Sequence, residues 1–331
     1  MTRGRPSVPR RGTLRGAPPQ TTGRRRTLPA SKWSKLLTES RNPRSLQLDS
    51  MSTERVVALL IDEDRLALLA AARKARLIAA AARLVAEAFT AGGRTLFVGA
   101  GTSGRLGVLE AAECPPTFGT APDRILGLMA GGEEAVFRAK EGSEDRGDDG
   151  AKAVADVTPR DVVVGISASS VTPFVRSALE VARKRRAKTV LVTCAPHSGL
   201  GRLADVVIAV RTGPEVLTGS TRLKAGSATK AVLNAITTAA MVRVGKAYTN
   251  FMVDLRQTSR KLEDRARRIV ALAADVDLVE ADRLVRAAED EVKTAIVMGR
   301  LSVDAADARR RLQAGDGHVR RALGGAARRR R

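Results

Sequence analysis

The chain has 331 residues, 44% of them hydrophobic, and a formal net charge of +23 at pH 7. No apolar run approaches the roughly 18 residues of a membrane-spanning helix, and the basic N-terminus lacks the apolar segment of a secretory signal. We therefore expect a soluble, cytoplasmic protein. The two cysteines, Cys114 and Cys194, are far apart and lack the spacing of metal ligands, which argues against a disulfide-based fold and a cysteine metal site.

Most of the positive charge lies at the ends of the chain. Residues 1–35 contain ten Lys or Arg and no acidic residue, and residues 309–331 contain nine Arg and one Asp, so the other 273 residues carry only +5. Segment 1–35 has no apolar periodicity and is predicted to be a disordered extension, and residues 324–331 form a second basic tail. Nonspecific contact of these tails with nucleic acid stays open as a hypothesis. A specific nucleic-acid partner is not expected, because Trp33 is the only aromatic residue beside these arginines.

The body of the chain shows a regular order of elements. Apolar residues recur at helical spacing from Arg55 to Phe89, which predicts two helices before the first strand. Five apolar runs then alternate with helical segments and are predicted strands, at residues 95–98, 125–129, 162–166, 189–193 and 206–210. This alternation is typical of an α/β fold with a parallel sheet covered on both faces. Ligands in such folds bind at the carboxyl ends of the strands.

The first predicted strand leads into the glycine-rich stretch 99–105, which contains Thr102 and Ser103. Their hydroxyls and the free N–H groups of the following helix can bind an anion, so this turn is a candidate phosphate site. The helix is expected to end at the two prolines that begin at Pro115, because the residue before a proline disfavours the helical conformation. Glu113 would then lie in the last turn, where the helix dipole favours a protonated carboxyl.

A second candidate anion site follows the third predicted strand. Ser167, Ser169 and Thr172 bring three hydroxyls to this loop, and Thr172 with Pro173 predicts the start of a helix. An ordinary hydroxyl-capped helix would explain this loop taken alone. Two such loops at one edge of a sheet favour a shared phosphate site.

The glycines at 99, 101 and 104 also fit the G-x-G-x-x-G pattern of dinucleotide-binding folds. In those folds an acidic residue about 20 positions further on binds the ribose. Here the next predicted strand ends in Ala130-Gly131-Gly132, and Glu133 comes 29 positions after Gly104. A phosphate without a dinucleotide is the better fit.

Five blocks stand out along the chain: Thr38–Pro43, Gly101–Leu109 with Glu113–Gly119, Glu141–Asp145, Gly213–Gly226 and Met252–Leu255. In this order they resemble the N-acetylmuramic acid 6-phosphate etherases, a family of sugar-isomerase (SIS) domain proteins. The resemblance runs from about residue 37 to about residue 323. It implies a three-layer α/β/α SIS domain with a five-stranded parallel sheet within residues 36–260, followed by a small C-terminal helical domain at 261–323. Helical apolar spacing after Lys261 agrees with the second domain.

The resemblance implies cleavage of the lactyl ether at C3 of N-acetylmuramic acid 6-phosphate, which gives N-acetylglucosamine 6-phosphate and D-lactate without a metal or redox cofactor. The family's reaction is an elimination across C2 and C3 of the open-chain sugar, followed by addition of water. Carried over by motif, Glu113 is the acid that protonates the departing lactate oxygen, and Glu144 is the base that removes the C2 proton. Acidic runs such as 141–149 are also typical of solvated surface, so the role of Glu144 depends on the resemblance.

The same resemblance implies a set of groups around the sugar phosphate: Thr102, Ser103, Ser167, Ser169 and Thr172 at the phosphate, with Ser220 and Lys224 nearby. Ser170 and Val171 stand where the family often has a glycine and a basic residue. A serine resists backbone angles that a glycine adopts freely, so the loop is expected to differ in detail.

Family members usually form homodimers through the SIS domain, so a homodimer with pockets near the interface is expected. One alternative to the enzyme stays open, because related proteins bind a sugar phosphate without turnover and regulate a partner enzyme. Ligand-induced stabilisation without release of lactate would favour that alternative.

Overall fold

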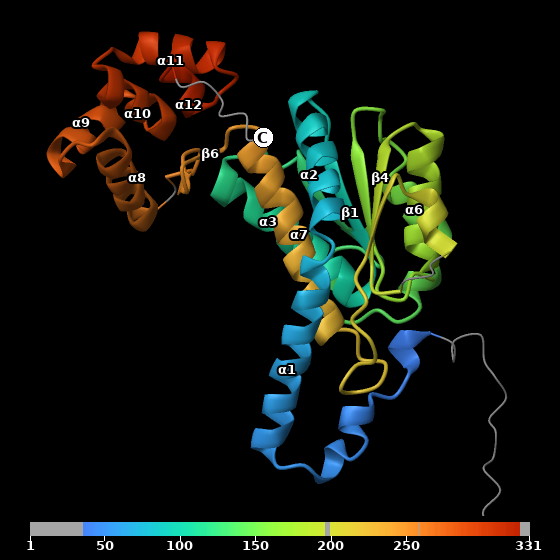
Figure 1. The fold of residues 1–331 in the computed structure, drawn as a ribbon. Helices are drawn as coiled ribbons and strands as arrows, with labels where there is room; N and C mark the ends of the chain where they lie inside the picture. Colours follow the sequence, from blue (N-terminus) through green and yellow to red (C-terminus); the bar gives the residue numbers. More distant parts are fainter. Residues whose placement is uncertain (1–35, 196–198, 258, 325–331) are drawn as a thin grey trace, which may run out of the picture.

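The computed structural model describes residues 36–195, 199–257 and 259–324. The extension predicted to be disordered, residues 1–35, and the basic tail after residue 324 lie outside the described residues. Figure 1 shows two lobes, an α/β lobe built on one sheet and a smaller helical lobe formed by the C-terminal helices. None of the helices in the described part of the chain combines the length and the hydropathy required to cross a bilayer.

The sheet of the α/β lobe confirms the predicted strands to within one residue at each end. Its strands are β1 (Thr95–Gly99), β2 (Ile125–Met129), β3 (Val162–Ile166), β4 (Lys188–Thr193) and β5 (Val206–Ala209). All are parallel, in the order β2-β1-β3-β4-β5. The strand order reverses direction between β1 and β3, and such a switch point opens a crevice at the carboxyl ends of the strands.

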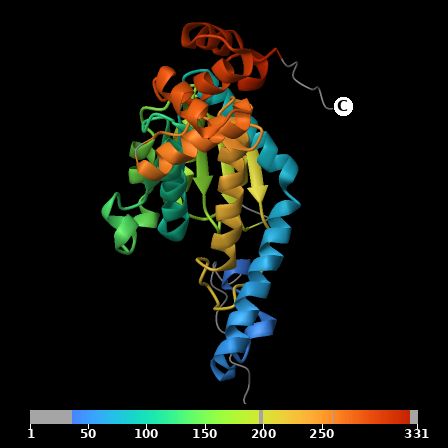
Figure 2. The same ribbon diagram turned by 90° about the vertical axis from the view of Figure 1, so that its left-hand side faces the viewer.

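Helices cover both faces of the sheet, which confirms the three-layer architecture. One face is covered by α2 (Ala75–Thr90), α3 (Gly101–Phe118) and α7 (Lys224–Arg243), and the other by α5 (Gly147–Ala153) and α6 (Pro173–Lys184). Phe97 packs in the first core, whereas its neighbours Leu96 and Val98 pack in the second, as the two-residue period of a strand requires. Figure 2 shows α3 and α7 side by side on the first face.

The two predicted helices before β1 are confirmed, since α1 (Thr53–Ala72) and α2 precede the first strand. The lower half of α1 extends beyond the sheet (Figure 1). Short elements complete the lobe: η1 (Leu37–Glu39), η2 (Pro43–Ser45), η3 (Leu48–Ser50), α4 (Glu134–Phe137), η4 (Ser143–Asp145) and η5 (Gly199–Leu203).

Two glycines of the first loop let α3 approach the sheet closely. A Cβ added at Gly104 would lie 2.7 Å from the Gly99 carbonyl oxygen, and one added at Gly99 would lie 2.7 Å from the Gly104 nitrogen. Any side chain at either position would push helix and strand apart. The glycine pattern therefore serves helix–strand packing.

The predicted end of α3 is wrong. The helix continues through Pro115 and Pro116 to Phe118, and Gly119 ends it in the left-handed conformation, φ 61°, with its N–H bonded to the Pro115 carbonyl at 2.9 Å. The prolines remove only two helical hydrogen bonds, while the continued helix buries Cys114 and Phe118 in the core. Glu113 therefore lies more than one turn before the end of α3, so the dipole argument for its protonation loses force.

The helical spacing predicted after Lys261 is confirmed by five helices, α8 (Arg260–Ala274), α9 (Leu278–Ala287), α10 (Val292–Leu301), α11 (Ala305–Ala314) and α12 (Val319–Ala322). They pack around a separate core. Ser259, Asp277 and Asp304 cap α8, α9 and α11 by accepting a backbone N–H. A short hairpin, β6 (Ala247–Tyr248) and β7 (Phe251–Met252), connects the lobes.

Candidate functional site

Two loops that carry hydroxyls meet at the switch point of the sheet. β1 and β3 are neighbouring strands, and the helices that follow them, α3 and α6, begin at their carboxyl ends. Thr102 and Ser103 lie in the first turn of α3 and are partly buried. The first turns of α3 and α6 have free N–H groups and the positive ends of the helix dipoles. These two helix starts can therefore bind an anion such as a phosphate.

The loop after β3 is held by its own hydroxyls. Ser167 Oγ and Thr172 Oγ1 share a hydrogen bond of 2.8 Å, and the Ser170 N–H donates to Ser167 Oγ at 3.0 Å. Thr172 occupies the N-cap position of α6, as predicted, but its hydroxyl contacts Ser167 instead of a helix N–H. Ser169 is partly buried in the same loop. Two of the three predicted hydroxyls, those of Ser167 and Thr172, are thus in contact, and Ser169 lies in the same loop.

Ser170 adopts the backbone conformation that a glycine would favour. Its φ is 62°, its side chain is buried, and its hydroxyl has no hydrogen-bond partner within the described residues. The loop therefore keeps a glycine-like turn although its residue is a serine.

Glu144 lies beside the start of α3. A cavity of about 130 Å³ is lined by Glu144, Gly101 and Arg105, among others. The Arg105 guanidinium donates to the carbonyls of Ala135 and Val136, each at 2.8 Å, and so holds α4 against α3. The structure thus brings Glu144, in η4, to the end of α3 that carries Thr102.

Glu113 lines a different cavity. Its exposed side chain lies on the outer face of α3, where a cavity of about 360 Å³ opens between α3 and α7. Lys230 and Asn234 of α7 line the same cavity. Within one chain the structure therefore does not bring Glu113 and Glu144 into one pocket.

The sequence did not point to Glu110, which lines the Glu113 cavity one helical turn earlier. Glu110 is buried, and its carboxylate accepts hydrogen bonds from Asn234 Nδ2 at 2.7 Å and from Thr237 Oγ1. Burial raises the pKa of Glu110, and the Thr237 hydrogen bond and the charge of Lys230 oppose that rise. The spacing of three residues from Glu113 on a helix was the available signal.

Lys224 occupies a buried position beside α1. Its ammonium is paired with Glu63, and both side chains are 5% exposed. Burial opposes ionisation of Glu63, but the hydrogen bond and charge of Lys224 and the hydrogen bonds from Arg44 and Asn42 outweigh it and lower the pKa of Glu63. Ser220 is partly buried in the loop before α7. The first turn of α7, which follows this loop, lies next to the start of α3, since a Cβ added at Gly226 would be 3.7 Å from Thr102 Cγ2.

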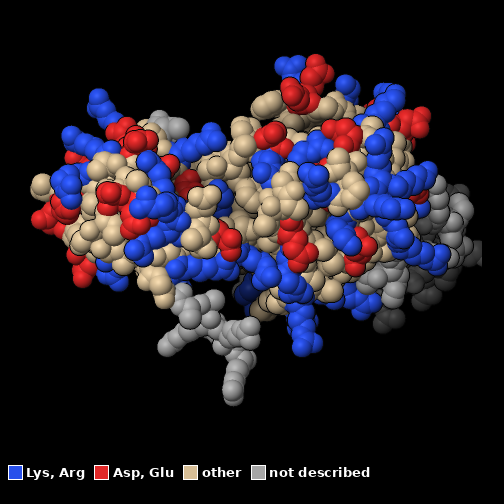
Figure 3. Space-filling model, turned by 90° about the horizontal axis from the view of Figure 1, so that it is seen from above, with Lys and Arg blue, Asp and Glu red and all other residues tan. Residues whose placement is uncertain are grey.

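Two further observations concern metal ligands and surface charge among the described residues. No group of three or more His, Cys, Asp or Glu could hold a metal ion in this part of the chain. Figure 3 shows acidic side chains interspersed among the basic ones over both lobes, so the face seen there is not uniformly basic.

Comparison with known proteins shows the family to which the chain belongs. The chain is 50% identical over 293 residues to the N-acetylmuramic acid 6-phosphate etherase of Salinibacter ruber, which covers 88% of this chain and 94% of that protein. The chain belongs to the N-acetylmuramic acid 6-phosphate etherase family. The etherase of Synechocystis sp. is 47% identical over 290 residues, covering 87% of this chain and 95% of that protein.

Two domain models match the α/β lobe. Residues 76–183 match the glucokinase regulatory protein N-terminal SIS domain, and residues 143–239 match the SIS domain. The SIS fold predicted for the α/β lobe is confirmed. The phosphoheptose isomerase of Neisseria gonorrhoeae is 20% identical, with a TM-score of 0.43, covering 58% of this chain and 98% of that chain.

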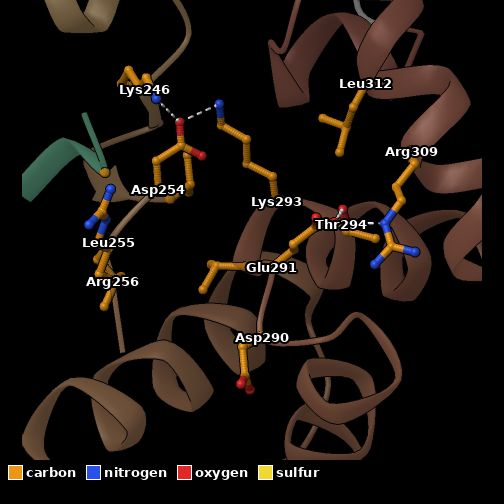
Figure 4. A pocket seen from close by; sticks show the side chains of 13 residues that line it. Lys246, Asp254, Leu255, Arg256, Asp290, Glu291, Lys293, Thr294, Arg309 and Leu312 are labelled. Atoms are coloured by element: carbon orange, nitrogen blue, oxygen red, sulfur yellow. Dashed lines mark hydrogen bonds and ion pairs between the residues drawn. The ribbon is translucent and has the colours of Figure 1, made fainter. Parts of the chain in front are cut away.

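In this member of the etherase family, a third cavity of about 440 Å³ lies where the lobes meet. Figure 4 shows Lys246 and Lys293 pointing toward the carboxylate of Asp254, which belongs to one of the sequence blocks shared with the family. The two ion pairs measure 3.0 Å to Lys246 and 2.7 Å to Lys293. Asp254 thus joins the end of α7 to α10, and its carbonyl oxygen packs against Gly119 at the end of α3.

Proposed function

We propose that the chain is an N-acetylmuramic acid 6-phosphate etherase, a carbon–oxygen lyase that releases D-lactate from C3 of the sugar. The observation that carries the proposal is the 50% identity to a curated etherase over nearly the whole length of both proteins. The hydroxyl-bearing loops at the carboxyl ends of β1 and β3 support it, because the substrate has a phosphate that they could bind.

The proposed mechanism needs two proton transfers. The phosphate is held by Thr102, Ser103 and the loop after β3, with the open-chain sugar extending away from the crevice. Glu144 removes the proton at C2, which the adjacent aldehyde acidifies, and Glu113 protonates the ether oxygen as the C3–O bond breaks. Water then adds to C3 of the unsaturated sugar and a proton returns to C2, so the products are N-acetylglucosamine 6-phosphate and D-lactate.

We propose further that this site is formed by two subunits, with Glu113 of one chain facing Glu144 of the partner subunit. The separate cavities of the two carboxylates in one chain support this arrangement. A two-fold axis that crosses the outer face of α3 would set the second half of one α3 against the first half of the other. That face is available, since Glu113 is exposed and Leu109 is 44% exposed.

The activity is tested by incubating the full-length protein with N-acetylmuramic acid 6-phosphate and measuring D-lactate. Release of D-lactate is expected, and a folded protein that releases none would contradict the proposal. The two roles are tested by exchange of the C2 hydrogen with solvent deuterium. Glu113→Ala should still exchange this hydrogen while failing to eliminate, whereas Glu144→Ala should do neither.

A second candidate function is a sugar-phosphate-binding regulator without turnover. The observation that supports it is the match of residues 76–183 to the glucokinase regulatory protein N-terminal SIS domain. A rise in the thermal midpoint with the sugar phosphate, together with no release of D-lactate, would favour this function over the enzyme.

A further inference from the structure

The cavity that contains Glu113 has one cation and a stripe of polar groups on the facing helix. Lys230, Asn234 and Thr238 of α7 all line it, and their spacing of four residues places them on one side of that helix. Glu113 faces this stripe from α3. The cavity of about 360 Å³ lies in the range of small-ligand sites.

Lys230 is available to a ligand. Its side chain is exposed, and no ion pair is found for it among the residues that the structure describes. The nearby Glu110 carboxylate is already engaged, because it accepts from Asn234 and Thr237 within the helix interface. The only basic side chain of the cavity thus retains the capacity to pair with an external anion.

Asn234 is fixed in a position from which it can also bind a ligand. One N–H of its amide donates to Glu110 at 2.7 Å, which fixes the side chain in the wall of the cavity. A primary amide has a second N–H and a carbonyl oxygen, so Asn234 can still donate to a ligand. Leu109 and Phe118 add apolar surface to the same cavity.

The chemistry of the proposed reaction specifies what must lie next to Glu113. The acid has to reach the ether oxygen, and in a lactyl ether the carboxylate is attached to the carbon bonded to that oxygen. A carboxylate and a methyl group therefore lie within a few bonds of the proton that Glu113 donates. The cavity offers a cation, a fixed amide and apolar side chains at that place.

We infer that the cavity between α3 and α7 is the subsite for the lactyl group, in which Lys230 pairs with the substrate carboxylate, Asn234 donates to it, and Leu109 and Phe118 contact the methyl group. This inference rests on the proposed function. It assigns Lys230 as the residue that distinguishes a free 2-alkoxy carboxylate from a neutral derivative. Glu110 acts through Asn234 as a positioning residue.

The test compares two substrates, N-acetylmuramic acid 6-phosphate and its lactyl carboxamide, in the wild type and in Lys230→Met. The amide substrate cannot form a charge-assisted pair with Lys230. The wild type should therefore cleave it with a kcat/KM roughly tenfold or more below that for the acid. Lys230→Met should lose most of this preference, because the charge that recognises the carboxylate is gone. Lys230→Arg should retain it.

The control is Lys184→Met, which removes an exposed lysine from α6 on the other face of the sheet and should keep the wild-type preference. Two results would overturn the assignment of the subsite. One is a wild type that cleaves both substrates with equal kcat/KM, releasing D-lactate from the acid and D-lactamide from the amide, and the other is a Lys230→Met protein that keeps the full preference. A wild type that releases no D-lactate from the acid would instead contradict the proposed function.

Discussion

Ser170 carries a local cost in the loop that would bind the phosphate. It holds a left-handed backbone angle, and its buried hydroxyl has no partner within the described residues. A residue with a Cβ in this conformation costs about 1–2 kcal/mol. Ser170→Gly is therefore expected to raise the free energy of unfolding by about 1 kcal/mol in urea denaturation, after the larger entropy that glycine loses on folding.

Ser170→Ala separates the two sources of this cost. It removes the unpaired hydroxyl but keeps the Cβ, so it should be less stable than Ser170→Gly. A Ser170→Gly protein that unfolds more easily than the wild type would show that the loop is not strained at this residue.

The residues of the candidate site show how much of it the sequence predicts. Thr102, Ser103 and the serines after β3 were predicted because hydroxyls after a strand have a local signature. Glu110 and Lys230 were missed as members of one cavity, since their juxtaposition depends on packing between α3 and α7. The hydrogen bond between Asn234 and Glu110 spans 124 positions in the sequence, and no local pattern predicts such a contact.

At the scale of elements, the strands were predicted well because each is a short apolar run buried on both faces. The end of α3 was predicted wrongly, since burial of Cys114 and Phe118 outweighs the local preference of the two prolines. The alternation of elements also predicted which loops meet. Which residues of α3 face outward depends on how α3 packs against α7, and a local sequence pattern does not predict this.

The contact between α3 and β1 gives a prediction for Gly104. A Cβ at this position would lie 2.7 Å from the Gly99 carbonyl oxygen and 2.8 Å from Met129 Cγ. Gly104→Ala should lower the free energy of unfolding by about 1–3 kcal/mol, because the backbone cannot give way cheaply. Gly199→Ala is the matched control, since among the described residues its Cβ would meet only the end of the Arg176 side chain, at 3.8 Å. Equal stability of the two variants would contradict close packing at Gly104.

Asp161 links the starts of β1 and β3, and the stabilisation that this link provides depends on pH. Its buried carboxylate accepts from the backbone N–H of Arg94 at 2.7 Å and of Thr158 at 2.8 Å, and it pairs with the Arg94 guanidinium at 3.1 Å. Burial opposes ionisation, but these partners outweigh it and hold the pKa of Asp161 below its usual value.

Because the folded state lowers this pKa, the stabilisation is complete above the unfolded pKa of about 4 and is lost as the pH falls through the lower folded value. Asp161→Asn should be less stable than the wild type at pH 7, and the difference should narrow below about pH 4. Urea denaturation at both pH values measures this. A difference that stays constant with pH would contradict the role of the charge.

At the scale of the whole molecule, the Asp254 carboxylate links the two lobes. Asp254 lies between Lys246 and Lys293, whose side chains are 18% and 14% exposed. Burial lowers the pKa of Lys293, and the Asp254 carboxylate opposes this. Removing the carboxylate would leave two ammonium groups facing each other in a partly buried site.

Asp254→Asn is therefore expected to lower the free energy of unfolding by about 2 kcal/mol, measured by thermal or urea denaturation. Adding Lys293→Met to this variant should recover part of the loss, because the unpaired charge is removed. Asp264→Asn, which breaks the exposed pair with Arg268, should change stability by less than about 0.5 kcal/mol. Equal changes in the free energy of unfolding for Asp254→Asn and Asp264→Asn would contradict the role of Asp254 in linking the lobes.

The central claim is that two chains complete each etherase site, with Glu113 of one chain acting beside Glu144 of the partner subunit. The direct measurement is D-lactate release after Glu113→Ala and Glu144→Ala proteins are mixed and allowed to exchange subunits. Each mixed dimer would contain one site with both glutamates, so random exchange should restore about a quarter of the wild-type rate. A mixture that exchanges subunits but stays as inactive as the separate variants would contradict the claim, because a site within one chain gains nothing from mixing.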